Sequence, residues 1–139
     1  MPPSSRWSLW LRSRRAQGEL ESWFRQQPLP PLVFAAVNNV ELPPRNDEVL
    51  TGNFYRVVRK GQAKWALFLC PCGCAEVITL SLQRIHSPRW AVKHNKTGRP
   101  TMWPSVWRDI GCLSHFWIDD GRVYWCHNTG TSPQEFSSW

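Results

Sequence analysis

The residues with the clearest chemical meaning in this chain are its cysteines. The stretch CPCGC places Cys70, Cys72 and Cys74 at every second position, with a proline and a glycine between them. Further along, Cys112 opens the stretch CLSH. Zinc prefers thiolate and imidazole ligands, which commonly arrive as close groups from turns. The spacing therefore predicts a zinc site that joins the CPCGC turn to a later segment.

The motif leaves the ligand set open, because six side chains compete for the four places of a tetrahedral zinc. The candidates are Cys70, Cys72, Cys74, Cys112, His115 and Cys126. We expect Cys72, Cys74 and Cys112 to bind first, with Cys70 as the fourth ligand. The alternative is a set of buried free thiols that pack as small apolar groups. Alternating cysteines around a proline and a glycine fit that alternative poorly.

Serine and histidine residues near the later cysteines supply the parts of a nucleophilic site. If the metal takes four cysteines, Ser105 and Ser114 are the candidate nucleophiles and His115 is the candidate base. Ser114 directly precedes His115, and neighbours on a strand point to opposite faces, so Ser105 is the better partner. Asp119 follows His115 by four residues on the same predicted strand face, and is the predicted group that orients the imidazole.

Each of these residues also has another interpretation. Ser105 in SVWRDI can cap a short helical turn, and Asp119 can be a turn residue of Asp-Asp-Gly. As a metal ligand, His115 would leave zinc an open position for hydrolytic chemistry. The remaining histidines are expected at the surface in polar turns: His86, His94 and His127.

The segments that must position these residues are mostly β-strands. FYRVVRK and KWALFLC flank a turn and predict a hairpin that runs into the first cysteines. AEVITLSLQ is rich in β-branched residues and predicts the next strand. FWIDDGRVYWC predicts a second hairpin around Asp-Asp-Gly, which returns Cys126 toward Cys112. We therefore expect a mostly β (α+β) fold, a small antiparallel β domain with a zinc clasp.

The chain is expected to divide into three parts. Residues 1–31 predict an N-terminal helical arm, which the prolines of QQPLPP end. Residues 32–128 form the β-rich zinc-binding domain, and residues 129–139 form a loose tail. Because the arm is separated from the strands by prolines, we expect residues 1–27 to be dispensable for folding of the β domain.

Composition restricts the partners and the compartment. A length of 139 residues suits one domain, and a formal net charge of +7 favours acidic partners. Ten tryptophans predict a core of flat rings or an aromatic-lined cleft. The sequence shows neither a signal-peptide pattern nor an apolar run of the ~18 residues that would span a bilayer. We therefore expect a cytoplasmic protein with no membrane partner and with reduced thiols.

Four ordered pieces of the sequence resemble a bacterial family of small zinc-binding proteins catalogued as a domain of unknown function. They are FLCPCGCAEVITLSL, RWAV, TMWPSVW and CLSHFWIDDGRVYWC, and they cover about residues 50–126. Members of that family are encoded beside ubiquitin-like, E1-like and E2-like genes, often in antiphage defence islands.

The resemblance implies a peptidase that processes or removes a ubiquitin-like modifier. The implied partners are the modifier, its conjugates and the E1-like and E2-like enzymes. The resemblance also favours serine chemistry on a domain that zinc stabilises. A zinc hydrolase is the alternative enzyme.

Two non-enzymatic hypotheses stand beside the peptidase. Basic charge, aromatic rings and zinc also describe small nucleic-acid-binding modules. One predicted hairpin carries the residues that would form a phosphate track: Arg56, Arg59, Lys60 and Lys64. Trp103 and Trp107 instead bracket Ser105 and predict a narrow cleft around an extended peptide tail, so nucleic acid is the less favoured partner. The other hypothesis is a non-catalytic zinc adaptor that binds the modifier or its ligase through tryptophan anchors.

Overall fold

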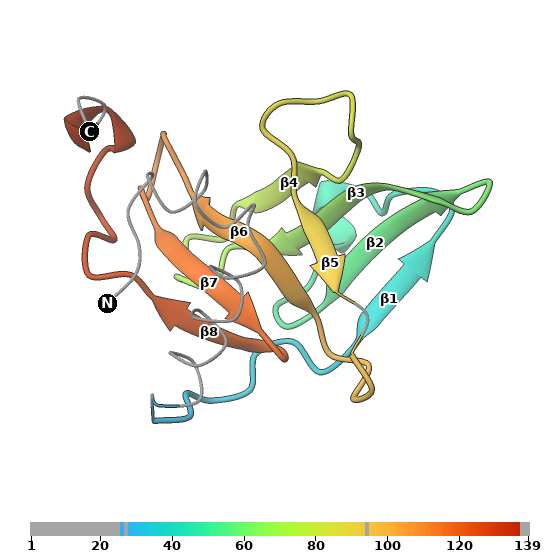
Figure 1. Ribbon diagram of the computed structural model, residues 1–139, viewed down its shortest axis with the longest axis horizontal. Coiled ribbons are helices and arrows are strands. Elements are labelled where there is room, and N and C mark those ends of the chain that lie inside the picture. Colours follow the sequence, from blue (N-terminus) through green and yellow to red (C-terminus); the bar gives the residue numbers. More distant parts are fainter. Residues whose placement is uncertain (1–25, 27, 94, 137–139) are drawn as a thin grey trace.

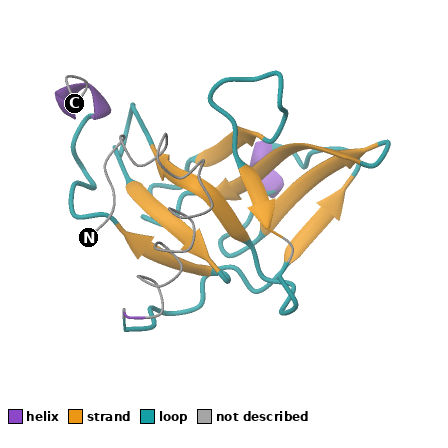
Figure 2. Cartoon of the chain, viewed as in Figure 1, coloured by secondary structure: helices purple, strands orange, loops and turns teal. Residues whose placement is uncertain are grey.

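The computed structural model describes residues 26, 28–93 and 95–136, which form two sheets of four strands each (Figure 1). The first sheet has the order β1-β2-β3-β4, with strands β1 (Val37–Val40), β2 (Phe54–Arg59), β3 (Gln62–Leu69) and β4 (Val77–Ser81). The second has the order β5-β6-β7-β8, with strands β5 (Ala91–Lys93), β6 (Thr101–Trp107), β7 (His115–Asp119) and β8 (Arg122–Trp125). Two short 3₁₀ turns complete the described elements, η1 (Asn46–Glu48) and η2 (Pro133–Phe136) (Figure 2).

The mostly β prediction is confirmed, and both expected hairpins form. All neighbouring strands pair antiparallel except β1 and β2, which are parallel. The hairpin turns carry positive φ at both central positions, Lys60–Gly61 and Asp120–Gly121. Such turns twist in the same sense as the strands that they join, and glycine at the second position favours them. None of the described residues belongs to a helix with the length and hydropathy needed to cross a bilayer.

The predicted helical arm falls almost entirely on residues that the structure does not describe. Only Gln26 and residues 28–31 of the range 1–31 are described, and residues 28–31 are not helical. The expectation that residues 1–27 are dispensable for folding likewise lies outside the described residues, apart from Gln26.

Aromatic side chains fill the core between the two sheets. Phe34, Phe54 and Phe68 are fully buried, and the rings of Phe54 and Phe68 stack with centroids 5.3 Å apart. Phe68 also meets Phe116 of the other sheet edge-on, with centroids 6.3 Å apart. Such aromatic pairs add about 0.5–1.5 kcal/mol beyond the apolar area that they bury. Because Phe116 and Ile118 point into this core, alternation along β7 turns His115 to the opposite face.

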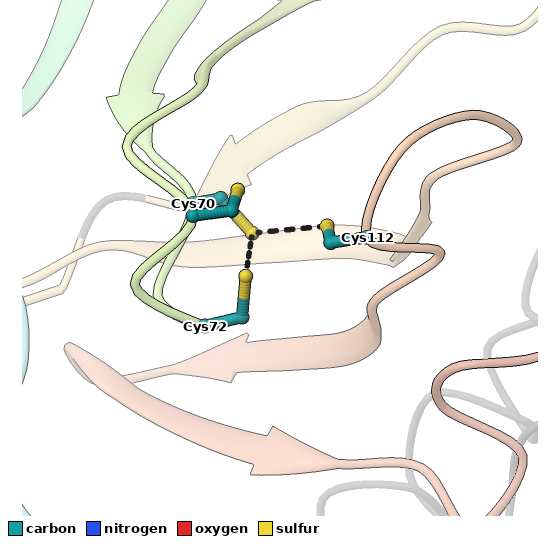
Figure 3. A group of neighbouring side chains, drawn as sticks. Cys70, Cys72 and Cys112 are labelled. Atoms are coloured by element: carbon teal, nitrogen blue, oxygen red, sulfur yellow. Dashed lines mark hydrogen bonds between the residues drawn. The ribbon is translucent and has the colours of Figure 1, made fainter.

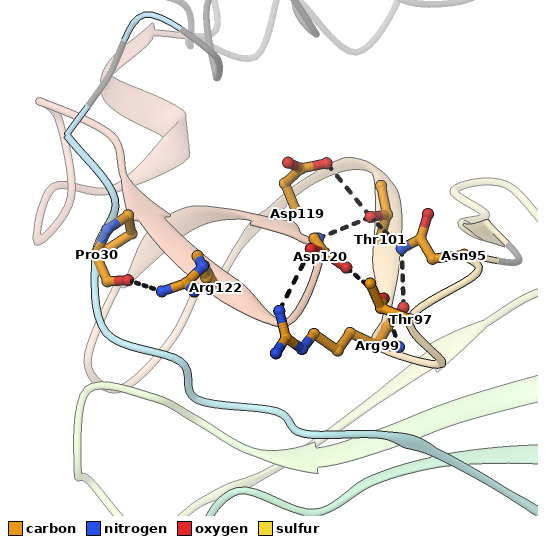
Figure 4. Close-up of polar contacts among 8 residues, drawn as sticks. All are labelled: Pro30, Asn95, Thr97, Arg99, Thr101, Asp119, Asp120 and Arg122. Atoms are coloured by element: carbon orange, nitrogen blue, oxygen red, sulfur yellow. Dashed lines mark hydrogen bonds and ion pairs between the residues drawn. The ribbon is translucent and has the colours of Figure 1, made fainter.

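Residues that precede β1 are tied to the β7–β8 turn. The amides of Val33 and Phe34 both donate to the Gly121 carbonyl at 2.9 Å, and the Gly121 amide donates to the Pro100 carbonyl at 2.8 Å. Arg122 adds a hydrogen bond from its guanidinium to the Pro30 carbonyl (Figure 4). Gly121 has φ +77°, and a Cβ at this position would lie 2.1 Å from the Phe34 carbonyl oxygen. The contact therefore requires glycine.

Replacing Gly121 by alanine is expected to destabilise the fold much more than the same change at Gly61. Both glycines have positive φ, but a Cβ on Gly61 meets nothing within 4 Å. Gly61→Ala should cost about 1–2 kcal/mol of unfolding free energy, the cost of a left-handed backbone for an L residue. Gly121→Ala should cost about 3 kcal/mol or more, because the backbone at Phe34 must also move. Urea unfolding measures both, and equal losses would contradict the close approach.

Candidate active site and metal centre

Ser105 and His115 meet on the face of the second sheet that points away from the core. His115 pairs directly with Trp107 across β6 and β7, and Ser105 lies two residues before Trp107 on the same face. The register shifts between Met102 and Val106, so the stretch of β6 that holds Ser105 departs from regular pairing. The Ser105 Oγ lies 3.0 Å from the His115 Nε2, which is hydrogen-bonding distance. The structure thus brings together the predicted pair of nucleophile and base.

Asn128 completes this arrangement at the other ring nitrogen. The His115 Nδ1 lies 2.7 Å from the Asn128 Oδ1, and an amide oxygen only accepts, so Nδ1 carries the proton. In the neutral ring, Nε2 is then free of a proton and accepts the hydroxyl of Ser105. The pKa of His115 is lowered to about 4, mainly because the ring is buried. The hydrogen bond with Asn128 raises this pKa and the charge of His127 lowers it, but both effects are smaller than that of burial. The imidazole is therefore neutral near pH 7, with the tautomer that a general base requires.

Residues of the predicted loose tail, 129–139, hold the imidazole and its neighbours. The Thr129 hydroxyl accepts the His115 amide at 2.9 Å. Trp107 stacks on the imidazole with centroids 4.2 Å apart and an angle of 3°, and its Nε1 donates to the Thr131 carbonyl at 3.0 Å. This part of the tail therefore packs on the domain. Trp103, the other predicted wall of the cleft, packs edge-on against Trp117 with centroids 6.1 Å apart.

Asp119 does not take the place that the sequence analysis gave it. Four residues along a strand correspond to about 13 Å, so a residue that shares a face with His115 at this separation lies at the other end of β7. The Asp119 Oδ1 accepts from the Thr101 hydroxyl at 3.3 Å, within the polar network of the β7–β8 turn (Figure 4). The prediction applied a separation that brings side chains together on a helix but not on a strand.

Asn128 is the site residue that sequence reasoning missed, although a signal was present. The β7–β8 hairpin returns the chain to the start of β7, where the Cys126 amide donates to the His115 carbonyl at 3.0 Å. Counting symmetrically about Asp-Asp-Gly therefore places residues just after Cys126 beside His115. The symmetry that returns Cys126 toward Cys112 thus also brings Asn128 to the imidazole.

Ser114, the second candidate nucleophile, belongs to the cysteine cluster. Its carbonyl accepts the amide of Arg108 at 2.9 Å, and its side chain is buried. Burial raises the pKa of the Cys112 thiol, but hydrogen bonds from the Ser114 side chain and backbone, together with those from Cys72 and Cys70, outweigh this and lower it to about 6. Ser114 thus points away from the imidazole of its neighbour His115, as alternation on a strand requires.

Four predicted ligands lie together and can hold a metal ion: Cys70, Cys72, Cys74 and Cys112, whose sulfurs are all within 4.8 Å of one another. The Cys70 sulfur is 3.4 Å from that of Cys72 and 3.8 Å from that of Cys112 (Figure 3). A tetrahedral zinc with Zn–S bonds of ~2.3 Å places its sulfurs ~3.8 Å apart, so the cluster fits this ion. Of the two other candidates, His115 is engaged by Ser105 and Asn128, and Cys126 is buried outside the group.

Arg108 supplies positive charge beside the cluster. One of its guanidinium nitrogens lies 3.8 Å from the Cys74 sulfur and 3.7 Å from the Cys112 sulfur. The other donates to Glu76 at 3.2 Å, which holds the guanidinium in place. Four thiolates around a divalent cation carry two net negative charges, and a neighbouring arginine offsets part of that charge.

Neither a curated protein nor a solved structure matches the chain. A family model described as "bacterial ubiquitination-like system serine protease (BubE)" matches residues 40–126. The matched range holds Ser105, His115 and all four clustered cysteines, and it ends just before Asn128. Since the match spans more than half of the chain, the protein belongs to the BubE family of serine proteases of bacterial ubiquitination-like systems.

Proposed function

We propose that this protein is a serine peptidase that processes or removes a ubiquitin-like modifier by cutting the bond after the modifier's C-terminal tail. The observation that carries the proposal is the 3.0 Å contact from the Ser105 Oγ to the His115 Nε2, with Nδ1 engaged by Asn128. The family description supports both the serine chemistry and the ubiquitin-like class of substrate.

In the proposed reaction, the Ser105 Oγ attacks the scissile carbonyl while its proton passes to the His115 Nε2. The imidazolium then gives that proton to the leaving amine, and the C–N bond breaks to leave an ester on Ser105. A water molecule then gives a proton to the same Nε2 and attacks the ester carbonyl. The C–O bond to Ser105 breaks, the Ser105 Oγ takes that proton back from Nε2, and the modifier leaves with a free carboxylate. Asn128 keeps Nδ1 protonated throughout, so that Nε2 always handles the transferred proton.

The surroundings of Ser105 contribute positioning. The Trp90 Nε1 donates to the Ser105 carbonyl at 3.1 Å and so anchors the backbone of the nucleophile. Backbone N–H groups near Val106 are the proposed oxyanion donors, each worth ~3 kcal/mol in such sites. Ser105 is only 6% exposed, so a scissile carbonyl reaches the hydroxyl only after neighbouring groups move aside. A slim, glycine-ended tail beside Trp103 requires the smallest such movement.

We propose that the four-cysteine cluster binds zinc and that the ion is structural. When bound, zinc supplies a cross-link between the CPCGC turn and the segment that joins β6 to β7. That segment connects the strand of Ser105 to the strand of His115. The cluster thereby sets the spacing of the nucleophile and the base, and takes no part in the proton transfers.

Cleavage of a ubiquitin-like protein of the same system, extended at its C-terminus, tests the nucleophile. Ser105→Ala should lower kcat at least ~10³-fold. Ser81→Ala is the matched control, because Ser81 also hydrogen-bonds a histidine, His86, but lies in the first sheet. Its activity should stay near that of the wild type. If Ser114→Ala loses cleavage at unchanged metal content while Ser105→Ala stays active, the nucleophile is Ser114 and not Ser105. A wild type that binds the modifier without cutting it would be an adaptor.

Changing Asn128 to aspartate should shift the pH profile of the reaction. The imidazole acts as a base only when neutral, and its present pKa of about 4 keeps kcat/KM flat across neutral pH. A carboxylate at Nδ1 stabilises the imidazolium and should raise that pKa by ~1–3 units. The acid limb of kcat/KM should therefore move to higher pH in Asn128→Asp. Profiles from pH 4.5 to 8, with metal content checked at each end, measure this. If the acid limb of kcat/KM stays at the same pH, Asn128 does not act on the His115 imidazole.

Elemental analysis tests the metal. Protein purified without added metal should contain one zinc per chain, and Cys112→Ser should lose it and unfold at lower temperature, since ligation couples to folding. Cys126→Ala is the control, because Cys126 is a buried cysteine outside the cluster. It should retain the zinc. A fully folded wild type without metal would overturn the proposal.

A further inference from the structure

A basic notch lies where the edges of the two sheets meet, and none of its lining residues belongs to the Ser105–His115 site. Its volume is about 90 Å³, and its lining comes from β1, β2, β5 and the loop between β5 and β6. The lining residues are Val37, Asn39, Arg56, Lys93, Asn95, Gly98 and Arg99. Three of these are cationic and none is acidic.

Two of the three cationic groups of the notch are held by polar neighbours. The Arg56 Nε donates to the Asn39 Oδ1 at 2.7 Å, which fixes the plane of the guanidinium and leaves its two terminal nitrogens outside that bond. Arg99 lies 3.5 Å from Asp120, an ion pair beside the notch (Figure 4). Because Asp120 offsets one positive charge, the notch keeps a net positive potential.

The backbone around the notch is also fixed before any ligand arrives. The Asn95 side-chain amide donates to the Arg99 carbonyl at 2.8 Å and to the Thr101 hydroxyl at 2.7 Å (Figure 4). The Val37 amide donates to the Gly98 carbonyl at 2.8 Å, which joins the two sheets at this edge. A site with fixed walls loses less conformational entropy when it binds.

These features favour one anionic group as the ligand. Two arginines in a small notch suit a carboxylate, which guanidinium groups bind through paired hydrogen bonds. Single-stranded nucleic acid is less suited, because no lining residue is aromatic and bases stack on aromatic rings. Two members of the predicted phosphate track are moreover engaged locally: Arg59 with the Glu41 carbonyl and Lys64 with Gln62.

We infer that this notch docks an acidic side chain of the ubiquitin-like substrate, which rests on the proposed function above. From Arg99 the chain runs into β6 and reaches Ser105 six residues later, which is at most roughly 20 Å away because the strand is not regular throughout. A compact domain of ~50–100 residues has a radius of gyration of ~10–13 Å, so it spans that distance while its tail lies at Ser105. The notch would thus hold the body of the modifier while the active site holds its tail.

Kinetics with the C-terminally extended modifier test the docking site. Arg56→Ala should raise KM about fivefold and Arg56→Glu more, with kcat unchanged, because the contact is remote from the reacting bond. Raising NaCl from 50 to 200 mM should increase KM more for the wild type than for Arg56→Ala. Arg84→Ala is the charge-matched control, since Arg84 is exposed on the 82–90 loop, and its KM should not change. The rate of p-nitrophenyl acetate hydrolysis depends on the nucleophile and not on docking of the modifier. It should be equal in the wild type, Arg56→Ala, Arg56→Glu and Arg84→Ala.

The outcomes separate this inference from the proposed function. If the wild type cuts the modifier and both Arg56 variants keep its KM, the notch does not dock the substrate and the inference fails alone. If the wild type cuts nothing, the peptidase proposal fails. Calorimetry then measures the affinity of the modifier for the wild type and for the Arg56 variants. Equal affinities would show that the notch does not dock the modifier. If Arg56→Ala loses binding to a single-stranded oligonucleotide but not to the modifier, the notch is a phosphate site and the inference is wrong.

Discussion

The contact between Phe68 and Phe116 determines which face of β7 is available for chemistry. These rings join the two sheets, with centroids 6.3 Å apart, and commit Phe116 and Ile118 to the core. His115 must then point to the other face, where Trp107 lies opposite it in the register. A slip of one residue would turn the imidazole into the core and the phenylalanine out of it. The same register of β7 therefore determines both which side chains pack in the core and which side chains form the site.

The cysteine cluster lies at the end of β7 where His115 and Phe116 begin the strand. Cys70 follows β3 of the first sheet, whereas Cys112 lies on the segment between β6 and β7. Arg108 begins that segment and Ser114 ends it, and both contact the cluster. The Arg108 amide donates to the Ser114 carbonyl at 2.9 Å, so the segment is also closed on itself. An ion in the cluster would thus stabilise the positions of Ser105 and His115 without touching either residue.

Local patterns in the sequence were sufficient for part of this structure. Lys-Gly and Asp-Gly turns between β-rich arms predicted both hairpins, since glycine after a residue in the left-handed region is what such turns need. The clustered cysteines and the Ser105–His115 pair were also predicted from residue types and spacing. The parallel pairing of β1 with β2 was not, because no short-range signal specifies which distant strand becomes a neighbour. The same holds for the register shift in β6 between Met102 and Val106, the stretch that holds Ser105.

The residue that hydrogen-bonds the His115 Nδ1 is one that the sequence pattern did not predict. Asp119 was chosen because it is acidic and shares a face with His115, but the hairpin brings Asn128 to Nδ1 instead. A carboxylate buried at that place would have to be desolvated, which costs several kcal/mol before any gain from pairing. An amide fixes the same tautomer without a charge, and the pKa of His115 stays near 4.

A base with so low a pKa has a definite consequence for the chemistry. It is neutral and ready at every pH near 7, but it takes a proton with less driving force than a histidine paired with a carboxylate. Its protonated form, in turn, is a strong acid that returns the proton readily to a leaving amine. In the proposed reaction, rate enhancement therefore comes mainly from positioning, through the stack of Trp107 and the anchored backbone of Ser105. The proposed reaction then needs a substrate that arrives already oriented, and the proposed docking contact at the basic notch would supply that orientation.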